Sequence, residues 1–328
     1  MWSSLASASL VFLILYLILF STLLTLFVLR KVPWKSRWLV LLLHVIVRLA
    51  SQCCGLSFGV IGYRNINLLV AYYVLGAEGY FTLVVCTARF LIAWQRNNWA
   101  GYSWLEPVDH TKKRPRFTFL ERLKGLFRWK AGSSNQWIMV TDWLLIAANA
   151  IIVAGGSLSS AAYTDSDLSA SQMYSKLDAA EAMRATGQAV FLAINVALLV
   201  CIAVSMHQHR HYRFDHATRI DSDIASAQKA PQQHKRPWYA HPTLLQLLLT
   251  WPLLTVRGIF GVLQAVLPDL NYFNPEVYDV NGLTRQFVIE ETCMVTLMEF
   301  ISATILTMTF FATRPESRLR REVSVSSA

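Results

Sequence analysis

The chain has 328 residues, of which 54% are hydrophobic and 15% are charged. Soluble domains carry about 25% charged residues, so a soluble fold of this composition would leave much apolar surface in water. The apolar residues also gather in long blocks rather than in helical or strand periodicities. The composition therefore excludes an ordinary soluble protein and predicts an integral membrane protein.

Seven apolar blocks are long enough to cross the roughly 30 Å hydrocarbon core of a bilayer as helices. In chain order they are residues 5–29, 38–62, 66–94, 137–159, 187–206, 243–267 and 285–312. Backbone polar groups in hydrocarbon need partners within their own segment, and the alternating strands of a barrel are absent. The sequence predicts an all-α fold, a seven-transmembrane-helix bundle over 1–312, with two long loops, 95–136 and 207–242, and a basic tail, 313–328.

Basic residues set the predicted orientation. The connections on one side of the predicted bundle carry 23 of the 30 Lys and Arg residues, whereas those on the other side carry Arg64, Lys176 and Arg184. Because cytoplasmic loops retain Lys and Arg, we expect the N-terminus outside and the C-terminus in the cytoplasm. Anionic lipid of the inner leaflet then accounts for the formal net charge of +10. We expect no nucleic-acid partner.

The loop 95–136 contains an amphipathic pattern. Apolar side chains recur there at helical spacing among basic residues, at Phe117, Leu120, Leu123 and Phe127. This pattern is typical of an interfacial helix lying in the headgroup region, and a solvated linker is the alternative.

The loop 207–242 opens with four histidines, His207, His209, His211 and His216. Histidine clusters bind zinc, copper or iron, but a membrane di-iron enzyme needs about eight ligands from several segments. Outside this loop only His44 and His110 remain. Nucleophile and cofactor motifs are also missing. We therefore expect no metal, no cofactor and no enzymatic activity.

The predicted outer connections, 161–186 and 268–284, are acidic and polar. From Pro268 to Pro275, turn-forming residues alternate with aromatic residues. This composition fits an ordered cap over the bundle, although an ordinary surface loop is the simpler interpretation.

Ionisable residues inside the predicted spans form the candidate functional site. A charge near the centre of a span costs about 2.5–3.5 kcal/mol, so each should face the bundle interior with a partner. The candidates are Arg48, Glu78, Arg257, Glu290, Glu291 and Glu299. A rise of 1.5 Å per residue places Arg257 level with Glu290 and Glu291, and Arg48 level with Glu78 and Glu299, which predicts these pairings.

Helical spacing supports an interior polar face. His44, Arg48, Ser51, Gln52, Gly55 and Gly59 follow one side of the second span, and Glu291, Val295 and Glu299 share a face of the seventh. Two interpretations stay open: a polar cavity that binds or moves a ligand, and buried pairs that only fix helix packing.

Short motifs in the spans resemble a known family. They are Arg48, Gly55, Gly59, Asn67 and Leu68, then Val256 and Arg257, and finally Met298, Glu299 and Phe300. The resemblance is to fungal seven-helix integral membrane proteins of unknown function, which are similar in layout to the fungal lipid-translocating exporters. It covers the spans and not the long loops. It implies a fungal membrane protein, and it transfers no established activity. We expect the location to be the plasma membrane or an endomembrane.

Three function classes follow. The first is transport or export of a lipid-like or small amphiphilic molecule through the charged cavity. The second is a receptor or sensor whose basic loops bind a cytosolic partner, although the third span ends Thr87–Ala88–Arg89–Phe90 without an acidic residue before the arginine. The third is a structural membrane protein without a ligand. The sequence favours transport, with the lipid bilayer and a small-molecule or lipid ligand as partners, and it gives no indication of oligomeric state.

Overall fold

A computed structural model describes residues 2–34, 36–65, 67–99, 103–105, 136–164, 169–224, 241–280 and 282–326. Its helices are α1 (Ser4–Val28), α2 (Arg37–Ile61), α3 (Asn67–Asn98), α5 (Gln136–Thr164), α6 (Ala170–Ile224), α7 (Pro242–Val266), α8 (Arg285–Glu291) and α9 (Met298–Ser326). A π-helical stretch, Thr292–Leu297, joins α8 to α9. The predicted interfacial helix at Phe117, Leu120, Leu123 and Phe127 lies outside the described residues.

Within the described residues, seven apolar helices are long enough to cross a membrane, which confirms the predicted all-α seven-helix bundle. Six of these segments lie in α1, α2, α3, α5, α6 and α7, and the seventh runs continuously from Arg285 to Ala312 through α8, the π-helical stretch and α9. The protein is therefore a multi-pass integral membrane protein whose solvent is the lipid bilayer.

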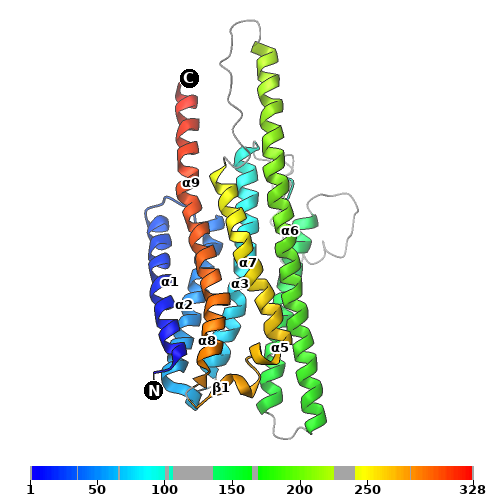
Figure 1. The fold of residues 1–328 in the computed structure, drawn as a ribbon. Coiled ribbons are helices and arrows are strands. Elements are labelled where there is room, and N and C mark those ends of the chain that lie inside the picture. The colour runs from blue at the N-terminus through cyan, green and yellow to red at the C-terminus, as the bar shows by residue number, and fades with distance from the viewer. Residues whose placement is uncertain are drawn as a thin grey trace.

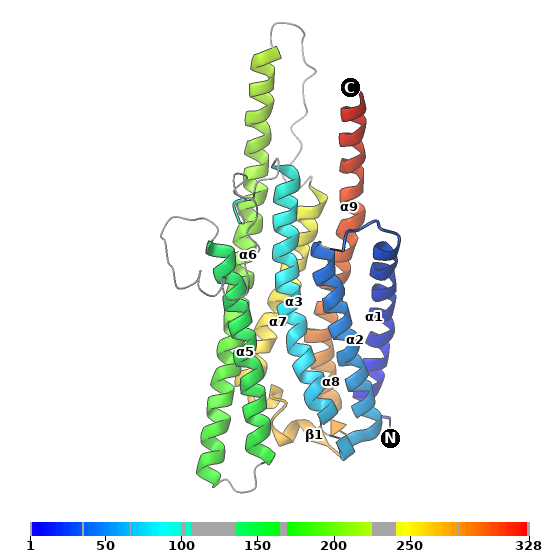
Figure 2. The same ribbon diagram turned by 180° about the vertical axis from the view of Figure 1, so that it is seen from behind.

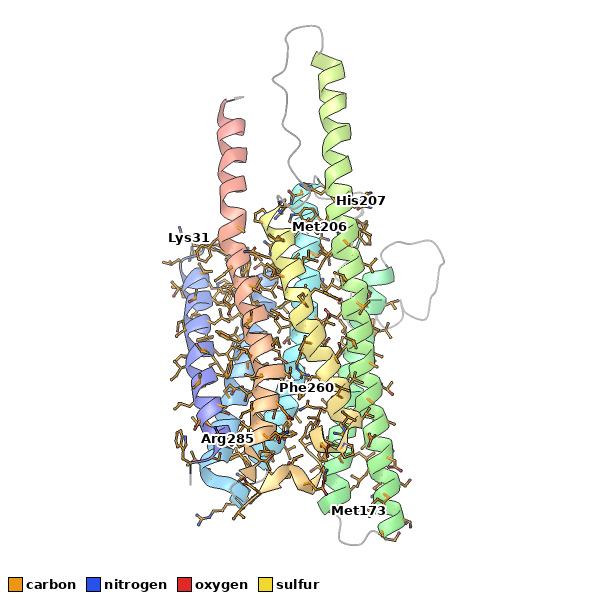
Figure 3. All side chains as sticks on the ribbon, viewed as in Figure 1. Lys31, Met173, Met206, His207, Phe260 and Arg285 are labelled. Atoms are coloured by element: carbon orange, nitrogen blue, oxygen red, sulfur yellow. The ribbon has the colours of Figure 1, made fainter. Side chains whose placement is uncertain are left out.

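The helices lie side by side along one axis, with the N-terminus at one end of the bundle and the C-terminus at the other (Figures 1 and 2). The end of the bundle that holds the N-terminus is called the N-terminal end, and the opposite end is called the C-terminal end. Lys31 and His207 lie toward the C-terminal end, whereas Arg285 and Met173 lie toward the N-terminal end (Figure 3). In sequence order α1 packs on α2, α2 on α3, α5 on α6, and α6 on α7, while α9 packs on α7.

The bundle buries polar side chains and exposes apolar ones, as a protein surrounded by lipid should. Arg48 and Glu299 are 2% and 0% exposed, while Ile18 and Phe311 are 60% and 57% exposed. The predicted polar side of α2 is buried over its whole length, from His44 to Gly59. This arrangement leaves hydrocarbon in contact with apolar side chains and gathers the polar groups in the centre.

Helix α6 is much longer than the predicted span 187–206. It starts at Ala170 and ends at Ile224, so most of the predicted outer connection 161–186 is helical, and so is the first half of the predicted loop 207–242. Helix α9 likewise continues into the predicted tail 313–328. These helices extend beyond the predicted spans because hydropathy marks only the lipid-immersed part of a helix, whereas a polar helix can continue past it.

The connection between α7 and α8 is an ordered cap over the N-terminal end. It contains 3₁₀ turns at Pro268–Leu270 and Pro275–Val277, and a hairpin of β1 (Tyr278–Asp279) with β2 (Gly282–Leu283). Val277 and Leu283 are buried and pack in one cluster with Leu5, Phe58 and Phe287. The simpler interpretation as an ordinary surface loop was wrong, because this segment carries its own apolar anchors.

Candidate functional site

One carboxylate holds two arginines in the centre of the bundle. Arg257 Nε on α7 donates to Glu299 Oε1 on α9 at 2.8 Å, and Arg48 Nε on α2 lies 3.2 Å from Glu299 Oε2. Arg48 Nη2 also donates to Thr296 Oγ1 at 3.1 Å. The three charged side chains are at most 4% exposed, so the cluster ties three helices together away from water.

The predicted partners of Arg257 were wrong. Glu290 is only partly buried and accepts a hydrogen bond from Gln286 Nε2 at 2.9 Å, because it lies a helical step of about 100° away from the inward-facing Glu291. Glu291 is 6% exposed and faces the interior, but its carboxylate lies beyond ion-pair distance of Arg257. The carboxylate that Arg257 reaches is Glu299, since α7 and α9 pack directly on each other.

Glu78 lies apart from the central cluster. Of the two carboxylates predicted for Arg48, Glu299 is the one in contact. Glu78 on α3 instead faces α5, where it accepts a hydrogen bond from Asn149 Nδ2 at 2.5 Å. It lies on a different side of α3 from Gly79, whose missing side chain gives Arg48 and Glu299 their space.

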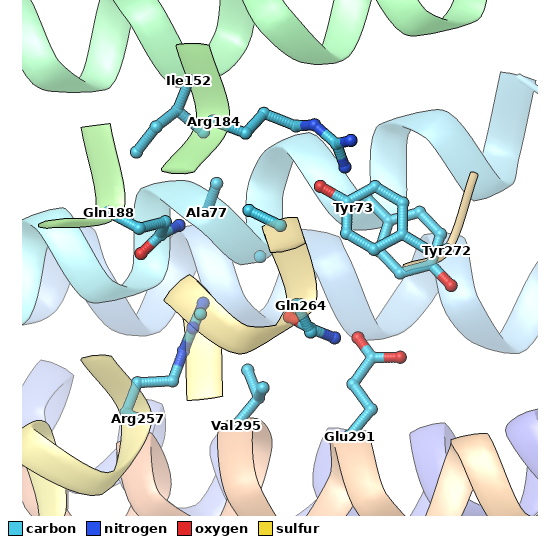
Figure 4. A pocket seen from close by; sticks show the side chains of 13 residues that line it. Tyr73, Ala77, Ile152, Arg184, Gln188, Arg257, Gln264, Tyr272, Glu291 and Val295 are labelled. Carbon is cyan, nitrogen blue, oxygen red and sulfur yellow. The ribbon is translucent and has the colours of Figure 1, made fainter. Parts of the chain in front are cut away.

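A small polar cavity lies next to this cluster, toward the N-terminal end and under the cap. Its volume is about 40 Å³. Its walls come from α3, α5, α6, α7, α8, the π-helical stretch and the cap, through Tyr73, Gly76, Ala77, Ile152, Arg184, Gln188, Arg257, Gly261, Gln264, Ala265, Tyr272, Glu291 and Val295. Figure 4 shows the side chains of Arg184, Gln188, Arg257, Gln264 and Glu291 around it.

The cavity walls carry polar atoms that have no hydrogen-bond partner in the part of the protein that the structure describes. These atoms are Tyr73 Oη, Gln188 Oε1, Arg257 Nη1 and Glu291 Oε2. Gln188, Arg257 and Glu291 are 7%, 4% and 6% exposed, so bulk water does not hydrate them. Buried polar groups are almost always paired, and a cluster of unpaired ones around a cavity is typical of a binding site.

Arg184 closes the cavity from the side of α6 and the cap. Its guanidinium donates to Asn271 Oδ1 at 3.1 Å and lies 4.6 Å from the ring centroid of Phe273, both in the cap. Next to it, Tyr272 of the cap stacks on Tyr73 of α3, with ring centroids 4.1 Å apart. Rings and guanidinium together hold the cap against α3 and α6.

The sequence interpretation missed the α6 side of the cavity. It placed Arg184 in an outer connection and left out Gln188 and Gln264. A signal was present, because Ala180, Arg184, Gln188 and Asn195 recur at helical spacing and continue the inward face of the span toward its N-terminus. All four are buried in the structure.

The histidines do not form a metal centre among the described residues, where no group of three metal-ligating side chains occurs. His44 is buried and its Nδ1 lies 2.9 Å from Thr82 Oγ1. At the C-terminal end, Trp94 Nε1 donates to the His241 ring at 3.0 Å, and the ring of His209 lies 5.4 Å from that of His241. The side chains of His211 and His216 lie outside the described residues.

Comparisons with family models, curated proteins and solved structures find no match for this chain. The resemblance to fungal lipid-translocating exporters therefore stays a prediction. What the structure shows is an all-α, seven-helix integral membrane protein with a buried charge cluster beside a capped polar cavity.

Proposed function

We propose that the protein moves an amphiphilic molecule across the bilayer, with the polar head of that molecule held in the capped cavity. The supporting observation is the set of buried, unpartnered polar atoms at Gln188, Arg257 and Glu291 around that cavity. Unpartnered polar atoms also occur elsewhere in the described bundle, but these border a cavity that a ligand can enter. Each buried unsatisfied group costs about 1–3 kcal/mol. A ligand offsets that cost.

The size of the cavity favours a head group over a whole lipid. A volume of about 40 Å³ is well below the roughly 300–1,000 Å³ of sites that enclose drug-sized molecules. A molecule with a long apolar tail would therefore keep the tail in lipid and insert only its head. Transporters bind their substrates between helices in a comparable way, at positions where helices are irregular.

Two irregular helices border the cavity. The π-helical stretch Thr292–Leu297 supplies Val295 to its wall, and α7 has Pro252 inside it. Pro252 removes a backbone hydrogen bond from α7, and π-helical turns occur frequently at functional sites. Both features give the walls segments that can rearrange when a head group passes.

Lipid translocation in reconstituted vesicles tests the proposal. Liposomes containing the full chain receive trace phosphatidylcholine or phosphatidylserine with a fluorescent nitrobenzoxadiazole label on the acyl chain. Dithionite added outside bleaches the outer leaflet, and we expect it to bleach inner-leaflet label only when the protein is present. If neither lipid crosses faster than in protein-free vesicles, while the reconstituted protein remains folded, the proposal is wrong.

A matched pair of glycines links translocation to the cavity. A Cβ added at Gly261 would lie 2.9 Å from Arg257 Nη1 and 2.7 Å from Gln188 Oε1, whereas a Cβ at Gly156 would meet no atom within 4 Å. We expect Gly261→Ala to slow the bleaching of inner-leaflet label several-fold and Gly156→Ala to leave it unchanged. Equal bleaching rates in the two variants would show that translocation does not depend on this cavity.

A sensor is the second candidate, supported by the relation of the cavity to α6, which extends beyond the bundle as α9 does. Helix α6 supplies Arg184 and Gln188 to the cavity and continues to Ile224. Its extension and that of α9 project at the end opposite the cap (Figure 1). A ligand-dependent change in the distance between spin labels on the two extensions, in the absence of lipid translocation, would favour this candidate.

A further inference from the structure

The buried charges around the cavity do not balance. Arg48, Arg184, Arg257, Glu291 and Glu299 are all at most 6% exposed, which sets three guanidinium groups against two carboxylates. Glu299 contacts Arg48 and Arg257, and among the described residues Arg184 has no carboxylate within ion-pair distance. A buried cation without a counter-ion is costly, so this region favours an additional negative charge.

Hydrogen-bond donors reach the cavity from two opposite walls. Arg257 Nη1 on α7 is buried and has no partner in the described protein, and it lies beside Gln188 of α6. Arg184 lies on the other wall (Figure 4). Its guanidinium donates a hydrogen bond to Asn271 Oδ1, which holds it in place. Tyr73 Oη is a further unpartnered group. Together these donors are arranged as in a site that holds an anion.

The small volume of the cavity favours a small anion. About 40 Å³ is above the roughly 10–15 Å³ that one water molecule requires and well below the roughly 300–1,000 Å³ of sites that enclose drug-sized molecules. A guanidinium pairs with the planar oxygens of a carboxylate through two parallel hydrogen bonds. A carboxylate is smaller than a tetrahedral phosphate, so a small cavity favours the carboxylate.

We propose that the cavity binds a carboxylate between Arg184 and Arg257. The carboxylate is either a free short-chain acid or the head of a carboxylic amphiphile, and in the second form the inference rests on the proposed function by naming its substrate class. Glu291 lines the same cavity with an unpartnered Oε2 and carries the same charge as the proposed ligand, so it repels that ligand.

This geometry gives variants whose effects differ in sign. Arg184→Gln and Arg257→Gln each remove a charge-assisted hydrogen bond, and we expect each to weaken carboxylate binding at least about tenfold. Glu291→Gln removes the repulsive carboxylate and keeps the side-chain shape, so it should strengthen binding several-fold. A gain of affinity cannot result from misfolding. Arg89→Gln is the control, because Arg89 pairs with Asp142 at 2.7 Å and does not line the cavity.

The experiment uses the full chain in phosphatidylcholine nanodiscs, with the thermal unfolding midpoint followed by tryptophan fluorescence. The probes are sodium acetate, sodium dodecanoate, dodecylamine and dodecanol, with sodium chloride matching the ionic strength. We expect dodecanoate to raise the midpoint in a saturable way, and dodecylamine and dodecanol to have no such effect. Saturable stabilisation by acetate as well identifies a free acid as a ligand, whereas stabilisation by dodecanoate alone identifies the head of an amphiphile.

Three results would overturn the inference: no saturable stabilisation by either carboxylate, equal affinity in wild type and Arg184→Gln, or stabilisation by dodecylamine that Glu291→Gln removes. The last result would assign the cavity to an amine. Lipid translocation without any carboxylate binding contradicts this inference and leaves the proposed function standing. Carboxylate binding without lipid translocation supports this inference and contradicts the proposed function.

Discussion

Glu299 shares its two oxygens between two arginines from different helices. Its Oε1 accepts from Arg257 and its Oε2 faces Arg48, and all three side chains are buried. A buried ion pair is weak evidence for stability by itself, because desolvation offsets the attraction between the charges. Removing one partner is different, since it leaves the remaining charges buried without compensation. In this cluster the loss of one carboxylate affects two guanidinium groups at once.

We therefore expect Glu299→Gln to lower the free energy of unfolding by about 3–5 kcal/mol. Denaturation of the detergent-solubilised protein by sodium dodecyl sulfate measures this quantity. Glu290→Gln is the matched control, because its carboxylate is only partly buried and contacts Gln286, and its effect should stay within about 0.5 kcal/mol. Equal effects of the two substitutions would mean that the central cluster does not stabilise the bundle.

Depth along a helix could be predicted from the sequence, whereas charge pairing could not. Counting residues placed Arg257 level with Glu291, and both do line the same cavity. The count assigned each arginine a carboxylate of its own, however, and it had no means of finding that Glu299 serves both Arg48 and Arg257. Pairing depends on which helices pack together, and helix neighbours are not encoded in the spacing of a single span.

At the scale of elements, the π-helical stretch sets which glutamates face inward. Glu291 and Glu299 are eight residues apart, and at 100° per residue a regular α-helix would turn them about 80° away from each other. Both are nevertheless buried, at 6% and 0% exposure. A π-helical turn contains about one residue more than an α-helical turn. The turns of Thr292–Leu297 therefore take up one additional residue and bring both carboxylates to the interior.

Deleting Met294 should convert this stretch to a regular α-helix without rotating the helix on either side. Met294 is 41% exposed, so its loss removes few interior contacts, and we expect the free energy of unfolding to change by less than about 2 kcal/mol. Deleting Ile259 is the control, because this residue is 46% exposed but lies in a regular part of α7. There a deletion rotates the following inward face by about 100°, and folded yield should collapse.

Folded yield is measured by size-exclusion chromatography in detergent. If deletion of Met294 disrupts the bundle as severely as deletion of Ile259, the π-helical stretch is not a regular α-helix with one residue inserted.

Over the cavity, the cap is held by aromatic contacts, in addition to the apolar anchors Val277 and Leu283. Tyr272 stacks on Tyr73 and lies 5.6 Å from the Arg184 guanidinium. An aromatic pair contributes about 0.5–1.5 kcal/mol beyond its area, and a partly desolvated cation–π contact contributes a similar amount. These contributions are small beside the stability of a bundle, so the cap can open while the helices remain packed.

We expect Tyr272→Ala to increase hydrogen exchange in the cap, residues 267–284, by about tenfold and to leave exchange in α2 and α7 unchanged. Hydrogen–deuterium exchange followed by mass spectrometry resolves the two regions. Tyr174→Ala is the matched control, since Tyr174 is 67% exposed on α6. Faster exchange throughout the bundle would show instead that the cap and the helices unfold together.

Element positions could be predicted well and element ends poorly. Seven apolar blocks were sufficient to find seven helices, because few other structures tolerate hydrocarbon. Helix α6 shows what hydropathy leaves out, since its first turns from Ala170 are polar enough to look like a loop and still carry Arg184 into the cavity. The same limitation left Arg184 out of the candidate site that the sequence predicts.

At the scale of the whole molecule, an odd number of spans separates the two ends of the chain. Lys31 and the C-terminus lie toward one end of the bundle, while the N-terminus and the cap lie toward the other (Figures 1 and 3). The connections that were predicted to be cytoplasmic carry 23 of the 30 basic residues. Each Lys or Arg near anionic lipid contributes about 1 kcal/mol, so this charge asymmetry strongly favours one orientation in the membrane.

Cysteine labelling in cells that produce the protein tests this orientation. Val280 in the cap is 95% exposed, and Lys31 in the connection from α1 to α2 is also exposed. In a background where the exposed Cys53 and Cys293 are replaced by alanine, we expect a membrane-impermeant maleimide to label Val280→Cys in intact cells. Lys31→Cys should react only after the membrane is permeabilised, because a basic connection is retained in the cytoplasm.

The reverse pattern would place the cap and its cavity on the cytoplasmic side, and a carried head group would then be taken up from the inner leaflet. Equal labelling of both positions would mean that the basic residues do not set the orientation.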